Sequence, residues 1–93
     1  MRVYLAGPIT GVSDYFEKFA KAAQQLRMEG HEVFNPAAAN LDELPINKIM
    51  AYELDWLCRE AEAIALLPGW INSKGATIEF LLAEYLKLKV IKL

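Results

Sequence analysis

The chain alternates short apolar runs with longer amphipathic segments, and this alternation limits the fold more than any other feature of the sequence. Helical spacing of apolar residues predicts three helices, over residues 13–29, 46–60 and 73–87. The apolar runs predict four strands, over residues 2–6, 31–34, 63–67 and 88–93. Such alternation forms right-handed βαβ units, whose parallel sheet is covered on both faces. We therefore expect an α/β three-layer sandwich with a four-stranded parallel sheet of order 2-1-3-4.

The composition favours one small domain that assembles with copies of itself. A length of 93 residues is enough for a single domain, over residues 1–93. The hydrophobic content of 55% is high for so short a chain, which indicates that part of the surface is buried in a homodimer or larger homo-oligomer. The 10 basic and 12 acidic residues form no like-charge block, so neither a nucleic-acid polymer nor a membrane is an expected partner.

The single cysteine and the lack of long apolar segments bear on where the protein works. Cys58 excludes an internal disulfide and suits a reducing compartment. The first residues lack the pattern of a signal peptide, and no segment approaches the roughly 20 apolar residues of a membrane-spanning helix. We therefore expect a cytoplasmic protein. Cys58 falls in an apolar stripe of the second helix, so we expect it in the core, and no Cys–His spacing supports a thiol nucleophile. His31 has no cluster of cysteines or histidines nearby, so no metal site is expected.

Two glutamates fall on helix faces that are otherwise apolar. At about 100° per residue, Glu53 shares a face with Met50 and Leu57, while Asp55 lies almost opposite. Glu79 likewise shares a face with the small and apolar residues of the third helix. Buried carboxylates are costly, so such a pair indicates a cleft in which two carboxyl groups divide acid and base roles, as glycosidic bond cleavage requires. The alternative is that each glutamate is partly exposed or bonded to a backbone amide.

The loops after the strands are the expected place for a ligand. Ligands of open parallel sheets bind beyond the carboxyl ends of the strands, near the switch between the first and third strands. The loop from Gly7 to Gly11 could hold an anion, although it matches neither the Walker pattern nor the dinucleotide-binding pattern. Trp56 and Trp70 could stack on a base. The loops expected at this edge are residues 7–11, 35–36 and 68–73, and a further loop is expected over residues 37–44.

Three stretches carry a resemblance to a known family. They are "VYLAGPITG", "GHEVFNP" and "AIALLPGWINSKGATIEFLLAEYLKLKVI", and the resemblance extends over essentially the whole chain. The chain resembles the nucleoside 2-deoxyribosyltransferase-like superfamily, above all its compact branch of often phage-borne domains of unknown function. It is also similar to the N-glycosidases of nucleoside 5′-monophosphates. The resemblance implies a flavodoxin-like fold and no metal or redox cofactor.

The resemblance implies roles for individual residues. Glu79 matches the glutamate that attacks the anomeric carbon, and Tyr4 matches a tyrosine that lies beside that glutamate. The family's second acid is the aspartate of an M-x-x-D-L pattern, which falls on Glu53, with Asp55 as the reserve candidate. Ser73 stands where transferases of free nucleosides have a sugar-binding aspartate. Hydrolases of nucleoside 5′-monophosphates have a serine there that helps to bind the phosphate, so the resemblance favours a nucleotide substrate.

These features together predict an enzyme that acts on nucleotides. We expect an N-glycosidase that hydrolyses the base–sugar bond of a (deoxy)nucleoside 5′-monophosphate, with Glu79, Glu53 and Tyr4 as its catalytic residues. The alternatives are a transferase that exchanges bases and a nucleotide-binding module without activity. The expected substrate-binding residues are Gly7, Pro8, Ile9, Asp55, Gly69, Trp70, Ser73 and Gly75.

Overall fold

The predicted strands and helices are all present, with ends within two residues of the expected ones. The computed structural model describes residues 1–39, 41 and 43–93, so residues 40 and 42 of the loop expected over 37–44 lie outside the described residues. The strands are β1 (Arg2–Ala6), β2 (Glu32–Phe34), β3 (Ala63–Leu66) and β4 (Lys89–Lys92). The helices are α1 (Tyr15–Met28), α2 (Ile46–Arg59) and α3 (Lys74–Tyr85), with short 3₁₀ helices η1 (Pro36–Ala38) and η2 (Trp70–Asn72) in segments expected to be loops.

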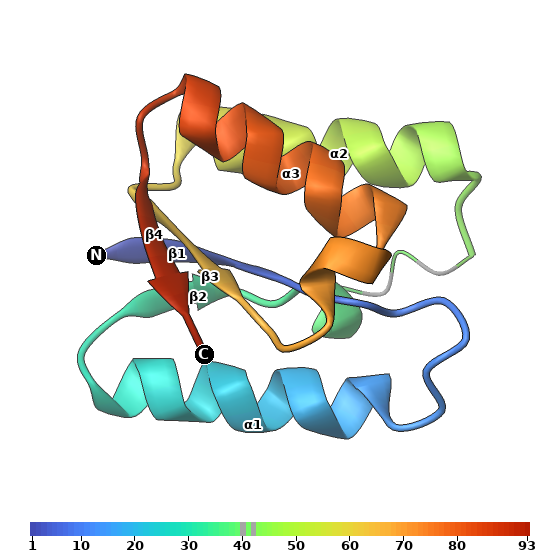
Figure 1. Cartoon of the computed structure of the whole chain (residues 1–93), viewed down its shortest axis with the longest axis horizontal. Coiled ribbons are helices and arrows are strands. Elements are labelled where there is room, and N and C mark those ends of the chain that lie inside the picture. Colours follow the sequence, from blue (N-terminus) through green and yellow to red (C-terminus); the bar gives the residue numbers. More distant parts are fainter. Residues whose placement is uncertain (40, 42) are drawn as a thin grey trace.

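The four strands form one parallel sheet in the order β2-β1-β3-β4 (Figure 1). This is the predicted order, and the architecture is that of a flavodoxin-like fold. Ala6 at the end of β1 pairs with Leu66 at the end of β3, so the carboxyl ends of the two central strands lie side by side. The chain then leaves β1 towards α1 on one face and leaves β3 towards α3 on the other, which opens a crevice at this edge.

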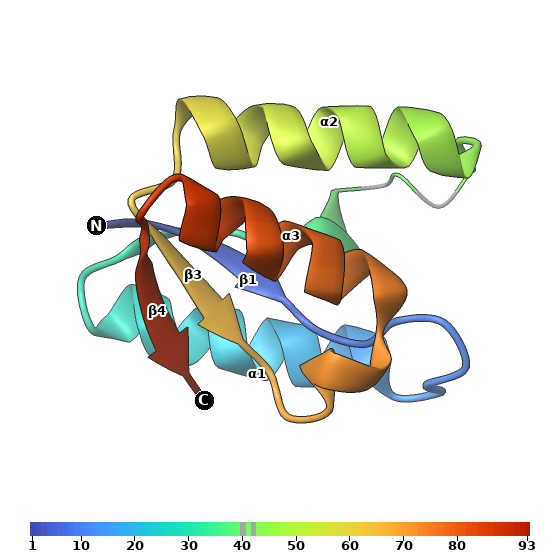
Figure 2. The ribbon, with the colours of Figure 1, turned by 45° about the horizontal axis from the view of Figure 1, so that its top comes forward.

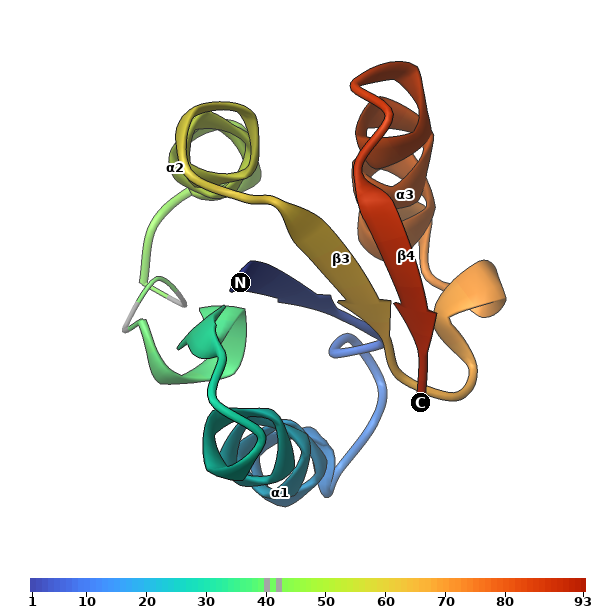
Figure 3. The same ribbon diagram turned by 90° about the vertical axis from the view of Figure 1, so that its left-hand side faces the viewer.

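The helices form two layers on opposite faces of the sheet (Figures 2 and 3). Side chains of a strand alternate between the faces, and in β1 Val3 and Leu5 join the core under α1. Tyr4 and Ala6 instead join the core with residues of α2 and α3. The alternation therefore places the Tyr4 side chain on the same face as the two helices that carry Glu53 and Glu79.

The start of α3 is fixed by a side-chain cap. Ser73 is the residue that caps this helix. Its Oγ accepts a hydrogen bond from the backbone N–H of Ala76 at 3.2 Å, which satisfies one of the unpaired amides of the first turn. In α1, Gly30 follows the helix end with a positive φ of 94°, as expected for a residue that closes a helix in the left-handed conformation.

The prediction that Cys58 lies in the core is wrong. Cys58 is exposed, whereas its neighbour Leu57 is fully buried. Successive residues lie about 100° apart around a helix, and α2 packs along the line through Glu53 and Leu57. Cys58 falls outside this narrow buried stripe. In the described part of the chain, no helix has both the length and the apolar character that a membrane crossing would require.

Candidate active site

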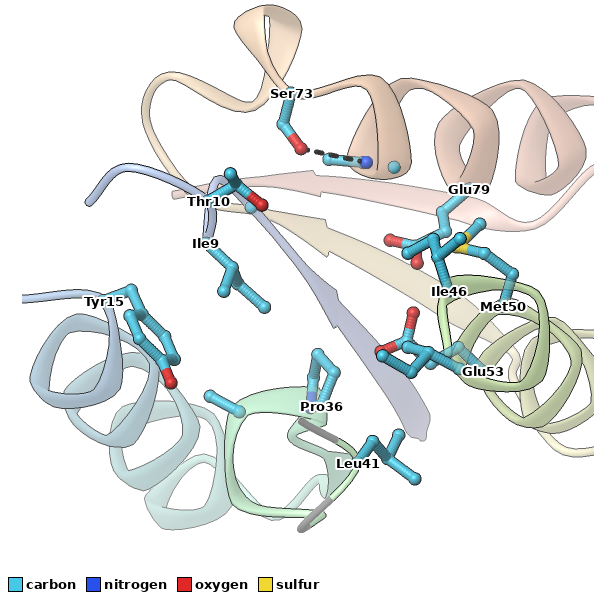
Figure 4. A pocket seen from close by; sticks show the side chains of 15 residues that line it. Ile9, Thr10, Tyr15, Pro36, Leu41, Ile46, Met50, Glu53, Ser73 and Glu79 are labelled. Carbon is cyan, nitrogen blue, oxygen red and sulfur yellow. Dashed lines mark hydrogen bonds between the residues drawn. The ribbon is translucent and has the colours of Figure 1, made fainter. Parts of the chain in front are cut away.

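A pocket of about 220 Å³ lies at the carboxyl edge of the sheet, where the loop after β1 meets η1, α2 and α3 (Figure 4). Its position follows from the topology, because β1 and β3 send their chains to opposite faces at this edge. The lining combines two carboxyl groups, two aliphatic hydroxyls, one phenol and an apolar majority. The lining residues are Gly7, Ile9, Thr10, Tyr15, Pro36, Ala37, Leu41, Ile46, Ile49, Met50, Glu53, Ser73, Gly75, Ala76 and Glu79.

Glu53 of α2 and Glu79 of α3 meet in this pocket, with carboxyl groups that point toward one another (Figure 4). The predicted burial of both is confirmed, since Glu53 is 7% and Glu79 is 5% exposed. On α3, Glu79 lies on the same face as Ala76 and Ala83, whose small side chains leave room for a carboxyl group close to the sheet. The helical phase of two separate helices therefore brings two acids together on one face of the sheet.

Tyr4 of β1 contacts Glu79 from the sheet. Its hydroxyl donates a hydrogen bond to Glu79 Oε2 at 2.8 Å, and the whole side chain is buried. The ring stacks on Phe34 with centroids 5.3 Å apart, and Phe34 stacks on Trp56 at 5.0 Å. This aromatic stack holds the Tyr4 ring in place, so the phenol fixes the orientation of the Glu79 carboxyl group.

Burial changes the acidity of all three groups. Burial first, and then the neighbouring Glu53, raise the pKa of Glu79 to about 9, against a lowering effect of the Tyr4 hydrogen bond. Burial also raises the pKa of Glu53, while its interactions with Glu79 and Tyr4 lower it. Burial and the two carboxyl groups hold the pKa of Tyr4 well above its usual value, so the phenol remains a donor. We conclude that the glutamate pair holds one proton at neutral pH, mainly on Glu79.

Few positive charges lie close enough to Glu53 and Glu79 to stabilise two ionised carboxylates. Among the pocket-lining residues that the structure describes, none is a lysine, arginine or histidine. Burial first, and then the repulsion between two like charges, explains why the carboxyl group of Glu79 keeps its proton. In the same described part of the chain, no three potential metal ligands gather in the way that a metal ion would require.

The N-terminal end of α3 forms a polar corner of the pocket. Ser73 lies there as the helix cap, and Thr10 from the loop after β1 lies near it (Figure 4). The backbone amides of the first helical turn carry partial positive charge, which favours an anion at such a place. The sequence pattern does not identify Thr10, although it indicates that the loop over residues 7–11 could hold an anion. Its hydroxyl is the signal that could have identified it.

The structure brings half of the expected substrate-binding residues to the pocket. Gly7, Ile9, Ser73 and Gly75 line it. Gly7 packs so closely on the residue directly after β3 that a Cβ atom at position 7 would lie 2.8 Å from the Cβ of Leu67. A glycine at this position therefore lets the loop stay close to the carboxyl end of the sheet.

The other four expected substrate-binding residues do not line this pocket. Asp55 is exposed on α2 and its carboxylate lies 3.8 Å from the guanidinium of Arg59, so it is not the partner of Glu79. Trp70 packs on Phe80 of α3, with ring centroids 4.6 Å apart. Gly69 forms the turn before η2 with a φ of 85°, where its Cα faces Pro8. Pro8 in turn lines a second cavity on the α1 side of the sheet.

Comparison with known proteins gives the chain a family. No curated protein and no solved structure matches it with significance. The sequence pattern of one protein family, described as "Domain of unknown function (DUF4406)", matches residues 1–92. This match extends over nearly the whole chain and includes every residue of the pocket. The chain therefore belongs to the DUF4406 family.

Proposed function

We propose that this protein is an N-glycosidase that hydrolyses the base–sugar bond of a (deoxy)nucleoside 5′-monophosphate. The observation that carries the proposal is the buried pair Glu53 and Glu79, with Tyr4 bonded to Glu79, in a pocket at the carboxyl edge of the sheet. Two carboxyl groups with separated proton affinities are what glycosidic cleavage uses, one as nucleophile and the other as acid and base. The sequence resemblance to nucleoside 2-deoxyribosyltransferase-like proteins supports the same reaction.

The first half of the reaction uses the single proton of the pair. On substrate binding, this proton passes from Glu79 to Glu53. The freed carboxylate of Glu79 attacks C1′, and the electrons of the C1′–N bond leave with the base. Glu53 gives its proton to the departing base, so a neutral base leaves and the sugar remains as an ester of Glu79.

The second half returns the pair to its starting state. Glu53, now ionised, takes a proton from a water molecule as the water oxygen attacks C1′. The C1′–O bond of the ester breaks and its electrons return to Glu79. Transfer of the proton from Glu53 back to Glu79 then restores the resting pair. Tyr4 holds Oε2 of Glu79 throughout, which leaves the other carboxyl oxygen to form the ester.

The phosphate of the substrate would lie at the polar corner. Ser73, Thr10 and the first amides of α3 supply hydrogen-bond donors there, and Lys74 begins the helix beside them. A phosphate carries negative charge, as does the glutamate pair, so it is best placed at the end of the pocket where the helix N-terminus favours anions. This arrangement supports a nucleotide over a free nucleoside.

We also propose that the protein works as a homodimer or larger homo-oligomer in the cytoplasm. The outer face of α3 exposes large apolar side chains, with Ile78 49% and Leu81 57% exposed. Ile71 of η2, just before α3, is a further exposed apolar side chain, at 70% exposure. Burial against a second copy would remove these side chains from water. A reducing compartment would also keep the exposed Cys58 as a thiol.

The test is base release from a panel of nucleoside and deoxynucleoside 5′-monophosphates, followed by mass spectrometry. We expect Glu79→Gln to lower the rate by about a thousandfold or more, because an amide cannot form the ester. Glu84→Gln is the matched control, since Glu84 is an exposed glutamate of the same helix. Full activity of Glu79→Gln would refute the mechanism.

The same assay separates the two alternative functions. Addition of a free base to the reaction would give an exchanged nucleotide if the protein is a transferase. Nucleotide binding by calorimetry without any product after long incubation would identify a binding module. Either result would replace the proposed hydrolysis, whereas free base and sugar phosphate in equal amounts are the products expected of it.

A further inference from the structure

The pocket has a third region, which the proposed mechanism does not use. Ile9, Tyr15, Pro36 and Leu41 line the part of the pocket beside α1 and η1, across from α3 (Figure 4). They come from the loop after β1, the first turn of α1, η1 and the segment after η1. We call these four residues the apolar lobe. The pocket therefore runs across the edge of the sheet, from the polar corner at α3 to the apolar lobe beside α1.

These three regions differ in chemistry, which favours one direction for a bound nucleotide. This step depends on the proposed function, since it takes C1′ to lie at Glu79. With the phosphate at the polar corner, the base on C1′ is left to occupy the apolar lobe. A flat, largely apolar base suits a lobe lined by aliphatic, proline and aromatic surfaces.

Within the apolar lobe, Tyr15 supplies the polar side chain among the residues that the structure describes. Its ring packs against the core under α1 and is only half-buried. The side-chain hydrogen bonds between described residues do not include its hydroxyl. The phenol can therefore donate a hydrogen bond to a ring nitrogen or carbonyl oxygen of a base, or accept one from an amino group.

We propose that Tyr15 determines base specificity, through a hydrogen bond between its hydroxyl and an edge of the base in the apolar lobe. The bases differ in the donors and acceptors along their edges, so one phenol at a fixed place favours some of them. A nucleotide whose base offers no partner would leave the phenol without a hydrogen bond, which weakens the binding of that nucleotide. Tyr15 thus acts on the choice of substrate, while Glu53 and Glu79 act on the bond that breaks.

The Tyr15→Phe variant tests this role, because it keeps the ring and removes only the hydroxyl. We expect kcat/KM for the preferred nucleotide to fall by about tenfold, the effect of one lost hydrogen bond, and the differences between bases to shrink. The 5-phosphate of 4-nitrophenyl 2-deoxyriboside has a leaving group without a base edge, so its hydrolysis should not change. Tyr52→Phe is the matched control, because Tyr52 is exposed on α2 and outside the pocket.

An equal fall for every substrate, the nitrophenyl compound included, would overturn the proposal, since it would indicate a general structural effect. Unchanged ratios between the bases would overturn it as well. A binding measurement separates this outcome from a failure of the proposed function. Calorimetry measures the affinity of each nucleotide for the Glu79→Gln variant and for the double variant Glu79→Gln with Tyr15→Phe. The comparison gives the base preference in binding without any turnover.

If the wild-type protein releases no base but the preference in binding disappears with Tyr15→Phe, the hydrolase is refuted and the role of Tyr15 stands. If nucleotides bind Glu79→Gln with the same relative affinities in both forms, the role of Tyr15 is refuted. The absence of any nucleotide binding to Glu79→Gln and of any base release by the wild type would refute both.

Discussion

The glutamate pair places an unusual demand on the folded state, because two carboxyl groups lie together where water cannot solvate both charges. Glu53 and Glu79 are each more than nine-tenths buried, and the described lining of the pocket offers no basic side chain. A single shared proton meets this demand at neutral pH. The proton that stabilises the fold is also the one that the proposed reaction transfers to the base.

This shared proton makes the stability of the protein depend on pH. The pKa of Glu79 rises from about 4.5 in the unfolded chain to about 9 in the folded one, so between these values the folded state binds the extra proton. Stability is therefore greatest at the acidic end of this range and falls as the pH rises, by at most about 1.4 kcal/mol per pH unit for one proton.

We expect Glu79→Gln to remove this pH dependence. Its free energy of unfolding should exceed that of the wild type by roughly 1–3 kcal/mol at pH 8, with a smaller difference at pH 6. Urea unfolding followed by circular dichroism at several pH values measures the difference. Glu84→Gln should follow the wild-type curve. Equal slopes for Glu79→Gln and the wild type between pH 6 and 9 would argue against a shared proton.

Tyr4 should tune the pH range of activity. Its hydrogen bond lowers the pKa of Glu79, so in Tyr4→Phe the carboxyl group holds its proton more tightly. Under the proposed mechanism, we expect kcat at neutral pH to fall by about tenfold and the alkaline limb of the pH–rate profile to move to higher pH. The phenylalanine ring preserves the stack on Phe34. A profile that falls in height without moving would contradict this role.

At the level of secondary-structure elements, two glycines hold the pocket open in different ways. Gly7 lets the loop after β1 lie against the chain that leaves β3, where a Cβ atom at position 7 would lie 2.8 Å from the Cβ of Leu67. Gly75 lies in the first turn of α3, and a Cβ atom there would have no heavy atom within 4 Å. One glycine is therefore required by packing, whereas the other leaves empty space in the pocket.

The variants Gly7→Ala and Gly75→Ala should accordingly have opposite effects on stability. Gly7→Ala forces β3 and the loop apart, and we expect a loss of about 1–3 kcal/mol in the free energy of unfolding. Gly75→Ala should keep the stability or raise it by up to about 1 kcal/mol, because alanine favours the helix. Its methyl group lines the pocket, so base release should nevertheless fall. Equal stabilities of the two variants would contradict this account.

At the scale of the whole molecule, the arrangement of layers exposes large apolar side chains on the outer surface of α3. The sheet packs against α1 on one face and against α2 and α3 on the other (Figure 3). The outer side of α3 then exposes Ile78 and Leu81 to solvent. Large apolar side chains so close together on a small protein are typical of a surface that is buried in an assembly.

We expect light scattering at working concentration to give at least twice the mass of one chain. The double variant Ile78→Glu with Leu81→Glu should give the mass of a single chain, because four buried charges in a two-fold contact would repel. The single variant Glu84→Gln lies on the same helix and should not change the assembly. A wild-type mass of one chain would refute the proposed oligomer.

Much of this architecture can be predicted from local periodicity. The apolar pattern fixes the strands and helices, and the right-handed crossover then permits few sheet orders, among them the observed β2-β1-β3-β4. Helical phase likewise identified Glu53 and Glu79 as buried, and placed Asp55 on the opposite side of α2. These inferences succeeded because each depends on the repeat of a single element.

Features that depend on contacts between distant segments could not be predicted from the sequence. Helical phase assigns Cys58 to the apolar stripe of α2, but the width of the buried stripe depends on how the helix packs against α3 and the sheet, and Cys58 is exposed. Trp70 is only three residues before Ser73, which lines the pocket, yet its ring packs on Phe80. Thr10 and Tyr15 reach the pocket through the path of the loop after β1, which no periodicity describes.

The chemistry of the site likewise depends partly on the sequence pattern and partly on tertiary packing. The sequence provides two acids and a tyrosine at positions whose helical and strand phases turn them to one face of the sheet. Whether the acids are close enough to share a proton depends on the packing of α2 against α3, and whether the phenol reaches Glu79 depends on the stack of Tyr4 on Phe34. Burial and distance set the pKa of Glu79, and both arise only when the layers come together.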